Sequence, residues 1–203
     1  MRKLLIVLAS LLWVSVLASA QLTTNIATDY EWQLAEPGRT LFRDRLPVGQ
    51  IALVAGRKEK MTGELLQVLT DIAFMPGDTV RHFATAFRVI DGDRVYSEVL
   101  ADAAELPELI KSARYIAETA VNIASTERAE THITFRTRAG MIIEFLQFGT
   151  EQQITIALPD PLSDGEIIRA LSADQLVLFS DLLDLTIFEL NRQGAGIKIK
   201  PSK

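Results

Sequence analysis

The stretch from 131 to 158 constrains the fold most, because two turn assignments made separately give the same apolar face. A three-residue loop at 138–140, which uses the left-handed conformation that glycine tolerates, and a two-residue loop at 149–150 define two successive hairpins. A slip of one residue in either hairpin would mix polar and apolar side chains on both faces. The stretch therefore predicts a three-stranded antiparallel meander. The pairs expected on its core face are Phe135 with Ile143, Ile143 with Ile156, and Phe145 with Ile154.

Short β-type segments precede this meander. Strands are expected at 51–54, 80–90 and 95–100, and the sequence leaves the register of the 80–100 hairpin open. Residues 64–74 carry both a two-residue and a helical period, and the strand is favoured. Within an irregular N-terminal arm at 21–49, alternating apolar residues predict a short edge strand. These alternating residues are Tyr30, Trp32 and Leu34.

Two segments have helical periodicity. The first lies between Asp102 and Ser125, where Asp102 and Glu105 can form a capping box at the N-terminus. The second begins where Ser172 and Gln175 form another capping box, and it ends near Gly194. It is apolar over more than half of its circumference, so one sheet face does not account for all of its apolar residues.

These elements predict an α+β fold. We expect one antiparallel sheet of six to eight strands with two long helices packed on it, most economically as a duplicated strand-strand-strand-helix unit. The expected division of the chain is a signal peptide at 1–20, an N-terminal arm at 21–49, a single α+β domain at 50–194 and a basic flexible tail at 195–203.

The first 20 residues have the pattern of a secretory signal peptide. A basic pair, Arg2 and Lys3, precedes an apolar run at 4–17 that is shorter than the roughly 20 residues needed to span a bilayer. The run ends at the small-residue triplet at 18–20, which is typical of a cleavage site. We therefore expect an exported protein, periplasmic or extracellular, that begins near Gln21 and is not embedded in the membrane.

Composition excludes several chemistries. The chain has no cysteine, which removes disulfides, thiolate nucleophiles and cysteine metal sites. Loss of the two basic residues of the signal peptide leaves 19 of the 21 basic residues against 26 acidic residues. With this excess of negative charge, nucleic acid is not an expected partner.

No catalytic motif was found in the sequence. His82 and His132 each lie near the start of a predicted strand, where a general base is conceivable and a surface histidine is favoured. No nucleophile elbow, phosphate-binding glycine loop or zinc-protease motif is present. No cofactor is expected.

Two groups of carboxylates are candidate metal or catalytic sites. The loop with Asp160, Asp164 and Glu166 offers oxygen ligands of the kind that calcium prefers, but three carboxylates do not complete its shell and ordinary turn chemistry is favoured. Asp181 and Asp184 lie one helical turn apart, and a solvated helix face is the favoured interpretation for them.

The second face of the meander supplies the predicted binding residues. It mixes apolar and charged side chains, and Arg136 is expected opposite Ile142 and within reach of Glu144. Either the N-terminal arm or another element of the chain covers this face, which is the favoured interpretation, or the face binds a partner. The candidate binding residues are Arg136, Ile142, Glu144, Leu146 and Phe148.

Three functions were compared on this basis. The favoured one is an exported non-catalytic domain that binds a protein partner or itself, through a sheet face or the broadly apolar helix. The alternatives are a hydrolase or metal-dependent enzyme that uses carboxylates and a histidine, and a binder of a small apolar ligand. A pocket where histidine and carboxylate converge would favour the enzyme, an enclosed apolar cavity the ligand binder, and an exposed apolar patch the protein contact.

Overall fold

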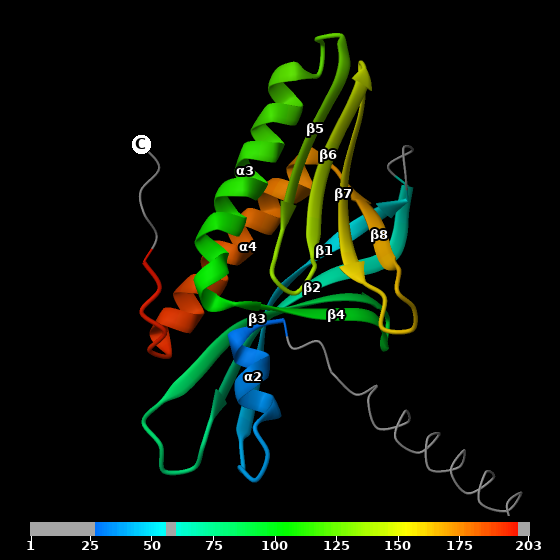
Figure 1. Ribbon diagram of the computed structural model, residues 1–203. Coiled ribbons are helices and arrows are strands. Elements are labelled where there is room, and N and C mark those ends of the chain that lie inside the picture. The colour runs from blue at the N-terminus through cyan, green and yellow to red at the C-terminus, as the bar shows by residue number, and fades with distance from the viewer. Residues whose placement is uncertain (1–26, 56–59, 199–203) are drawn as a thin grey trace, which may run out of the picture.

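The fold was obtained as a computed structural model that describes residues 27–55 and 60–198. The expected signal peptide at 1–20, the start of the N-terminal arm at 21–26 and the end of the basic tail at 199–203 lie outside the described residues, as do residues 56–59. An eight-stranded antiparallel sheet and three α-helices make up the described fold, which is α+β as expected (Figure 1). The strands are β1 (Phe42–Ala55), β2 (Lys60–Phe74), β3 (Arg81–Asp91), β4 (Arg94–Asp102), β5 (Arg128–Arg136), β6 (Ile142–Gly149), β7 (Glu151–Pro159) and β8 (Glu166–Leu171).

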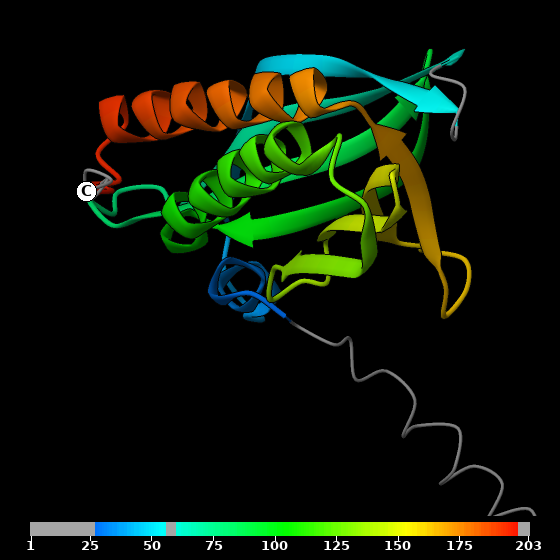
Figure 2. The same cartoon turned by 90° about the horizontal axis from the view of Figure 1, so that it is seen from above.

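The sheet has the strand order β4-β3-β2-β1-β8-β7-β6-β5. Its two halves, β1 to β4 and β5 to β8, meet where β1 and β8 pair at Val54 and Ala170. The helices α3 (Leu106–Ile123) and α4 (Ala173–Arg192) lie side by side against the inner face of this bent sheet (Figures 1 and 2). Each of these helices follows one half of the sheet in the chain.

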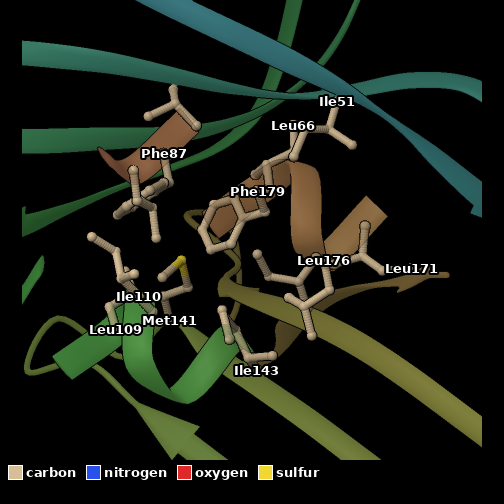
Figure 3. Close-up of a cluster of buried hydrophobic side chains, with 14 of the residues drawn as sticks. Ile51, Leu66, Phe87, Leu109, Ile110, Met141, Ile143, Leu171, Leu176 and Phe179 are labelled. Atoms are coloured by element: carbon tan, nitrogen blue, oxygen red, sulfur yellow. The ribbon is translucent and has the colours of Figure 1, made fainter. Parts of the chain in front are cut away.

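The main hydrophobic core fills the space between the helices and both halves of the sheet. Phe179 of α4 lies near the middle of it, with Leu66 from one half and Ile143 from the other (Figure 3). Because both helices share this core with all parts of the sheet, the two halves are held together mainly by packing and little by strand pairing.

The register expected for the meander is confirmed. In the structure β5, β6 and β7 pair through Phe135 with Ile143, Ile143 with Ile156, and Phe145 with Ile154. Gly140 has a φ of 91° in the first loop, the left-handed conformation that the turn assignment required. The apolar face formed by these pairs lies in the core.

The ambiguous segments of the first half form strands. Residues 64–74 belong to β2, which confirms the favoured assignment. The 80–100 hairpin pairs Phe87 with Val99, and a register shift next to Val89 separates this pairing from the turn. That bulge breaks the simple alternation, which is why the sequence left the register open.

The segment at 166–171 was not expected to be regular, yet it forms strand β8. It is short and follows a loop rich in turn residues, so its local pattern is weak. Pairing with β7 along its length gives it strand geometry.

The edge strand expected at Tyr30, Trp32 and Leu34 is wrong, because these residues lie in a helix, α2 (Asp29–Ala35). Thr28 caps the helix and forms a capping box with Glu31. Helical spacing places Tyr30 and Leu34 on one face, where both join a second apolar cluster on the outer face of β2 to β4. Trp32 points away and is 62% exposed.

Besides the two long helices α3 and α4, the described residues therefore form a third, short helix, α2, which lies on the opposite face of the sheet. Both capping boxes expected from the sequence are present. The first lies at the 3-10 turn η2 (Ala103–Glu105) that leads into α3, and the second lies at Ser172 and starts α4.

Replacement of Ser172 by alanine is expected to lower the free energy of unfolding by about 1 kcal/mol, because its hydroxyl accepts a hydrogen bond from the backbone N–H of Gln175. Chemical denaturation of the variant and the wild type gives this value. Ser125→Ala, in the exposed turn after α3, is the control and should change stability by less than about 0.5 kcal/mol, because no side-chain hydrogen bond of Ser125 is found among the described residues. An equal loss in both variants would contradict the capping role.

Candidate interaction surface

The outward side of α4 carries large apolar side chains that the rest of the described chain leaves exposed. Val177, Leu178, Leu185 and Phe188 are each between 45% and 64% exposed. Two aspartates and an arginine share this side of the helix. We define the α4 outer surface as Asp174, Val177, Leu178, Asp181, Leu185, Phe188 and Arg192.

The neighbouring helix α3 lies on the same face of the sheet, so the outward sides of the two helices can be compared. Both helices lie on the same face of the sheet and contact each other. The outward side of α3 is mostly polar, with Tyr115 and Val121 as its exposed large apolar residues. Its exposed polar residues are Glu108, Lys111, Arg114, Glu118 and Asn122. The contrast shows that placement in the fold does not by itself account for the apolar side of α4.

Strand β1 borders α4 on one side. Leu182 of α4 packs against Gly49, where an added Cβ would lie 2.5 Å from a Leu182 methyl carbon. The side-chain amide of Gln175 donates a hydrogen bond of 2.5 Å to the carbonyl oxygen of Ala52. These contacts fix α4 along β1, so the α4 outer surface is held on a rigid support.

The free edge of β1 is poorly suited to adding another strand. Within the described residues β1 pairs with β8 only at Val54, which leaves the edge at 42–52 open. Pro47 lies in this segment and the register shifts next to it, and Arg43 to Arg45 are charged. Proline, a bulge and charges are the features with which edge strands avoid pairing.

The predicted binding residues of the meander lie on the outer face of β5 and β6, the face away from α3 and α4. Phe148 is 51% exposed, Leu146 is half-buried, and Ile142 is buried among its neighbours. The pairing of Arg136 with Ile142 occurs as expected. The N-terminal helix α2 covers the outer face of the other half of the sheet, so it does not cover these residues.

The expected charge pair between Arg136 and Glu144 is not formed. Arg136 lies 3.8 Å from Glu166 of β8, and Glu144 is bound by His132 at 2.6 Å. His132 follows the alternation of β5 onto the same face, where it also contacts the hydroxyl of Thr134 at 2.8 Å. Arg136 is diagonal to Glu144 on the paired strands, which allows a charge pair, but His132 on the same strand as Arg136 binds Glu144 instead.

His132 and His82 belong to different halves of the sheet and make no joint site. His132 and Glu144 lie on an exposed strand surface. His82 lies at an open depression of about 560 Å³ that is also lined by Asp29 and Asp102. Among the described residues its side chain has no hydrogen-bond or ion-pair partner.

The carboxylates at this depression hold α2 in place. Asp102 accepts hydrogen bonds of 3.0 Å from the backbone N–H groups of Asp29 and Tyr30 at the start of the helix. Arg138, from the loop between β5 and β6, donates to both Asp29 and Asp102. This bonding lowers the pKa of Asp29 and keeps its charge paired. The depression therefore combines a histidine with carboxylates that are already engaged.

A second, buried carboxylate anchors α2 through the side chain of Tyr30. Asp71 of β2 is fully buried, accepts a hydrogen bond from the Tyr30 hydroxyl, and pairs with Arg43 and Arg45. Burial raises the pKa of Asp71, while Tyr30 and Arg45 act in the opposite direction. Burial and the contact with Asp71 also raise the pKa of the Tyr30 hydroxyl. The network is structural, since its polar groups satisfy one another beneath α2.

Most of the carboxylates considered as metal or catalytic groups are also engaged in hydrogen bonds or ion pairs. Asp160 accepts hydrogen bonds from the Leu162 N–H and the Ser163 hydroxyl, which lower its pKa. Asp181 and Asp184 both face Arg114 of α3, so they form an ion-pair cluster between the helices. Within residues 27–55 and 60–198 no three acidic or histidine side chains are grouped as a metal site requires.

No protein-family model, curated protein or solved structure matches this chain. In the part of the chain that the structure describes, no helix is both long and apolar enough to cross a membrane.

Proposed function

We propose that this protein is an exported, non-catalytic binding module whose contact is the α4 outer surface. The observation that carries the proposal is the contrast between two neighbouring helices. The outward side of α3 is mostly polar and exposes two large apolar residues, Tyr115 and Val121. The outward side of α4 exposes four, namely Val177, Leu178, Leu185 and Phe188. An apolar patch bordered by charged groups, such as Asp174 and Arg192, has the composition of a protein contact.

The rigid placement of α4 supports this function. Its inward side is fixed by Phe179 and Leu183 in the core, and the Gln175 side chain ties its first turn to β1. A preordered helix loses little conformational freedom when a partner binds, which favours affinity.

The geometry supports the alternative functions less well. For an enzyme, the nearest arrangement is His82 with Asp29 and Asp102, but Arg138 binds both carboxylates, and Asp102 also accepts hydrogen bonds from the backbone at the start of α2. For an apolar ligand, the described depression is open and is lined by several polar groups. Ligand-binding and active sites are usually enclosed apolar pockets with a few converging polar groups, and the depression at His82 does not have this form.

Export is part of the proposal, and it is supported by the basic pair, the apolar run and the small-residue triplet at 1–20. The duplicated unit also stays a proposal. The order of elements supports a repeat with four strands in each unit, in place of the expected three, because each set of four strands is followed by one long helix.

The outer face of the meander is a second candidate contact. The specific observation in its favour is Phe148, a large aromatic side chain that is half exposed beside Leu146 on a face that α2 does not cover. This face has less exposed apolar area than the α4 outer surface, because the polar side chains of His132, Glu144 and Arg136 also lie on it.

Photocrosslinking in cells that export the full chain tests which surface is the contact. A photoreactive phenylalanine analogue replaces Phe188 on α4, Phe148 on the meander, or Tyr115 on α3 as the matched control. We expect a crosslinked product from position 188 and none from position 115. A second change, Leu185→Ser, in the variant with the probe at 188 should remove the product, because it removes neighbouring apolar surface.

A crosslinked product from position 148 alone would show that the outer face of the meander, and not α4, is the binding surface. Absence of a product from both 188 and 148, or equal products from 188 and 115, would contradict the proposed function. Circular dichroism of each variant shows that it remains folded, as expected for changes at exposed positions.

A further inference from the structure

The exposed residues of α4 follow the spacing of a coiled-coil seam. Successive members of one stripe are separated by four and three residues in turn, which keeps them on one side of a helix for its whole length. The stripe consists of Asp174, Leu178, Asp181, Leu185, Phe188 and Arg192. Every one of these residues is exposed, so the stripe is open from the first turn of α4 to the last.

The stripe is complementary to itself when it is reversed. In an antiparallel pair of α4 helices related by a two-fold axis, Asp174 lies opposite Arg192 at both ends. Leu178 then lies opposite Phe188, and the two central layers each combine Asp181 with Leu185. A parallel pair would instead place Asp174 against Asp174 and Arg192 against Arg192, which repels at both ends.

The central aspartate does not oppose this arrangement. Asp181 lies 3.8 Å from Arg114 of α3 in the same chain, so its charge has a partner before any association. Its aliphatic neighbour Leu185 can therefore pack at the axis while the carboxylate stays at the margin. Asp174, in contrast, has no ion-pair or side-chain hydrogen-bond partner among the described residues. Arg192 pairs with Glu189 of its own helix at 2.7 Å, but it is largely exposed, so its guanidinium can also bind Asp174 of another copy.

We propose that the occupant of the α4 outer surface is a second copy of this chain, held by antiparallel packing of the two α4 helices about a two-fold axis. This inference rests on the proposed function and names its partner. The contact is isologous, so the same patch serves both subunits and the assembly closes at two copies. It uses helices and not strand addition, because Pro47, the bulge and the charged residues protect the free edge of β1.

Charge reversal with complementation tests the pairing. The variants Asp174→Arg and Arg192→Asp each place like charges opposite each other at both ends of their own dimer. Each is expected to dimerise about 30-fold more weakly than the wild type, as two exposed ion pairs become two repulsions. An equimolar mixture of the two variants restores opposite charges at both ends, so it should dimerise as tightly as the wild type.

Sedimentation equilibrium at several protein concentrations measures the dissociation constants. Glu118→Arg on the outward side of α3 is the matched control and should leave dimerisation unchanged. The difference between the single variants and the wild type should shrink as salt is added, because these charges are exposed.

A wild-type protein that remains monomeric at every concentration would overturn this inference, as would a dimer that is insensitive to both reversals. The photocrosslinking experiment separates these failures from failure of the proposed function. A product from position 188 with the mass of two copies supports self-association. A product with any other mass, together with a monomer in sedimentation, rejects the second copy and keeps α4 as the contact for a different protein.

Discussion

Replacement of Phe179 by alanine is expected to lower the free energy of unfolding by about 3 to 5 kcal/mol. Phe179 is fully buried, and its ring centroid lies 5.7 Å from that of Phe87 at a tilt of 54°. It contacts the core between the two halves of the sheet, where Leu66 and Ile143 approach from opposite sides (Figure 3). Loss of the ring removes buried apolar contact and leaves a cavity that these rigid elements cannot close.

The control is Phe188→Ala, in which the same residue type is lost from the opposite side of the same helix. Because Phe188 is exposed in the single chain, its loss should cost less than about 0.5 kcal/mol when the protein is dilute and monomeric. If the proposed dimer forms, the difference in the free energy of unfolding between this variant and the wild type should grow at high protein concentration, because dimerisation would stabilise the folded wild-type chain. Chemical denaturation at two protein concentrations measures both effects. Equal losses for Phe179 and Phe188 in dilute protein would show that the orientation of α4 is wrong.

Replacement of Asp71 by alanine is expected to cost about 3 kcal/mol, the second large effect. The change leaves the buried Tyr30 hydroxyl without its acceptor and leaves Arg43 and Arg45 without the carboxylate between them. Breaking a buried ion pair typically costs about 3 to 5 kcal/mol of stability. We expect a value near the lower limit, because the arginines are partly exposed and Glu98 still binds Arg45 at 2.6 Å. Asp44→Ala, at an exposed position of the same sheet half, should cost less than about 0.5 kcal/mol.

A double-mutant cycle with Tyr30→Phe identifies the element that Asp71 supports. If Asp71 holds α2 against the sheet through Tyr30, the two changes together should cost clearly less than the sum of the single changes. Limited proteolysis near residues 29–35 should also become faster in both variants, since α2 loses an anchor. Additive losses with unchanged proteolysis would show that the ion pairs alone account for the effect of Asp71.

The proposed dimer gives the broad apolar surface of α4 a physical role. An exposed stripe such as Leu178, Leu185 and Phe188 invites nonspecific association in a monomer. Placing Asp174 and Arg192 at its ends selects one orientation of the partner and disfavours others. Self-association would thus bury the apolar residues and limit the assembly to two copies.

Much of the fold could be predicted from local sequence patterns. The meander was correct because its alternation and its two turns constrain each other within 28 residues, from 131 to 158. The starts of both long helices were correct because capping boxes are local hydrogen-bond patterns. The α2 helix was missed although Thr28 and Glu31 carry the same signal, because three alternating apolar residues in a short segment also fit a strand.

The broad apolar circumference of α4 was also visible in the sequence, together with the prediction that one sheet face would not cover it. The sequence could not identify which side stays open. That side was decided by α3, which pairs Arg114 with Asp181 and Asp184, and by β1, whose Gly49 receives Leu182.

The course of β8 and the coverage of the two outer sheet faces were likewise decided only by tertiary structure. The segment at 166–171 becomes a strand because β7 offers it a pairing edge. The helix α2 lies over β2 to β4 because Asp71, Asp102 and Arg138 bind it there, which leaves Phe148 on the other half exposed. Periodicity records which side of an element is apolar, whereas the neighbour that covers that side depends on contacts between residues far apart in the chain.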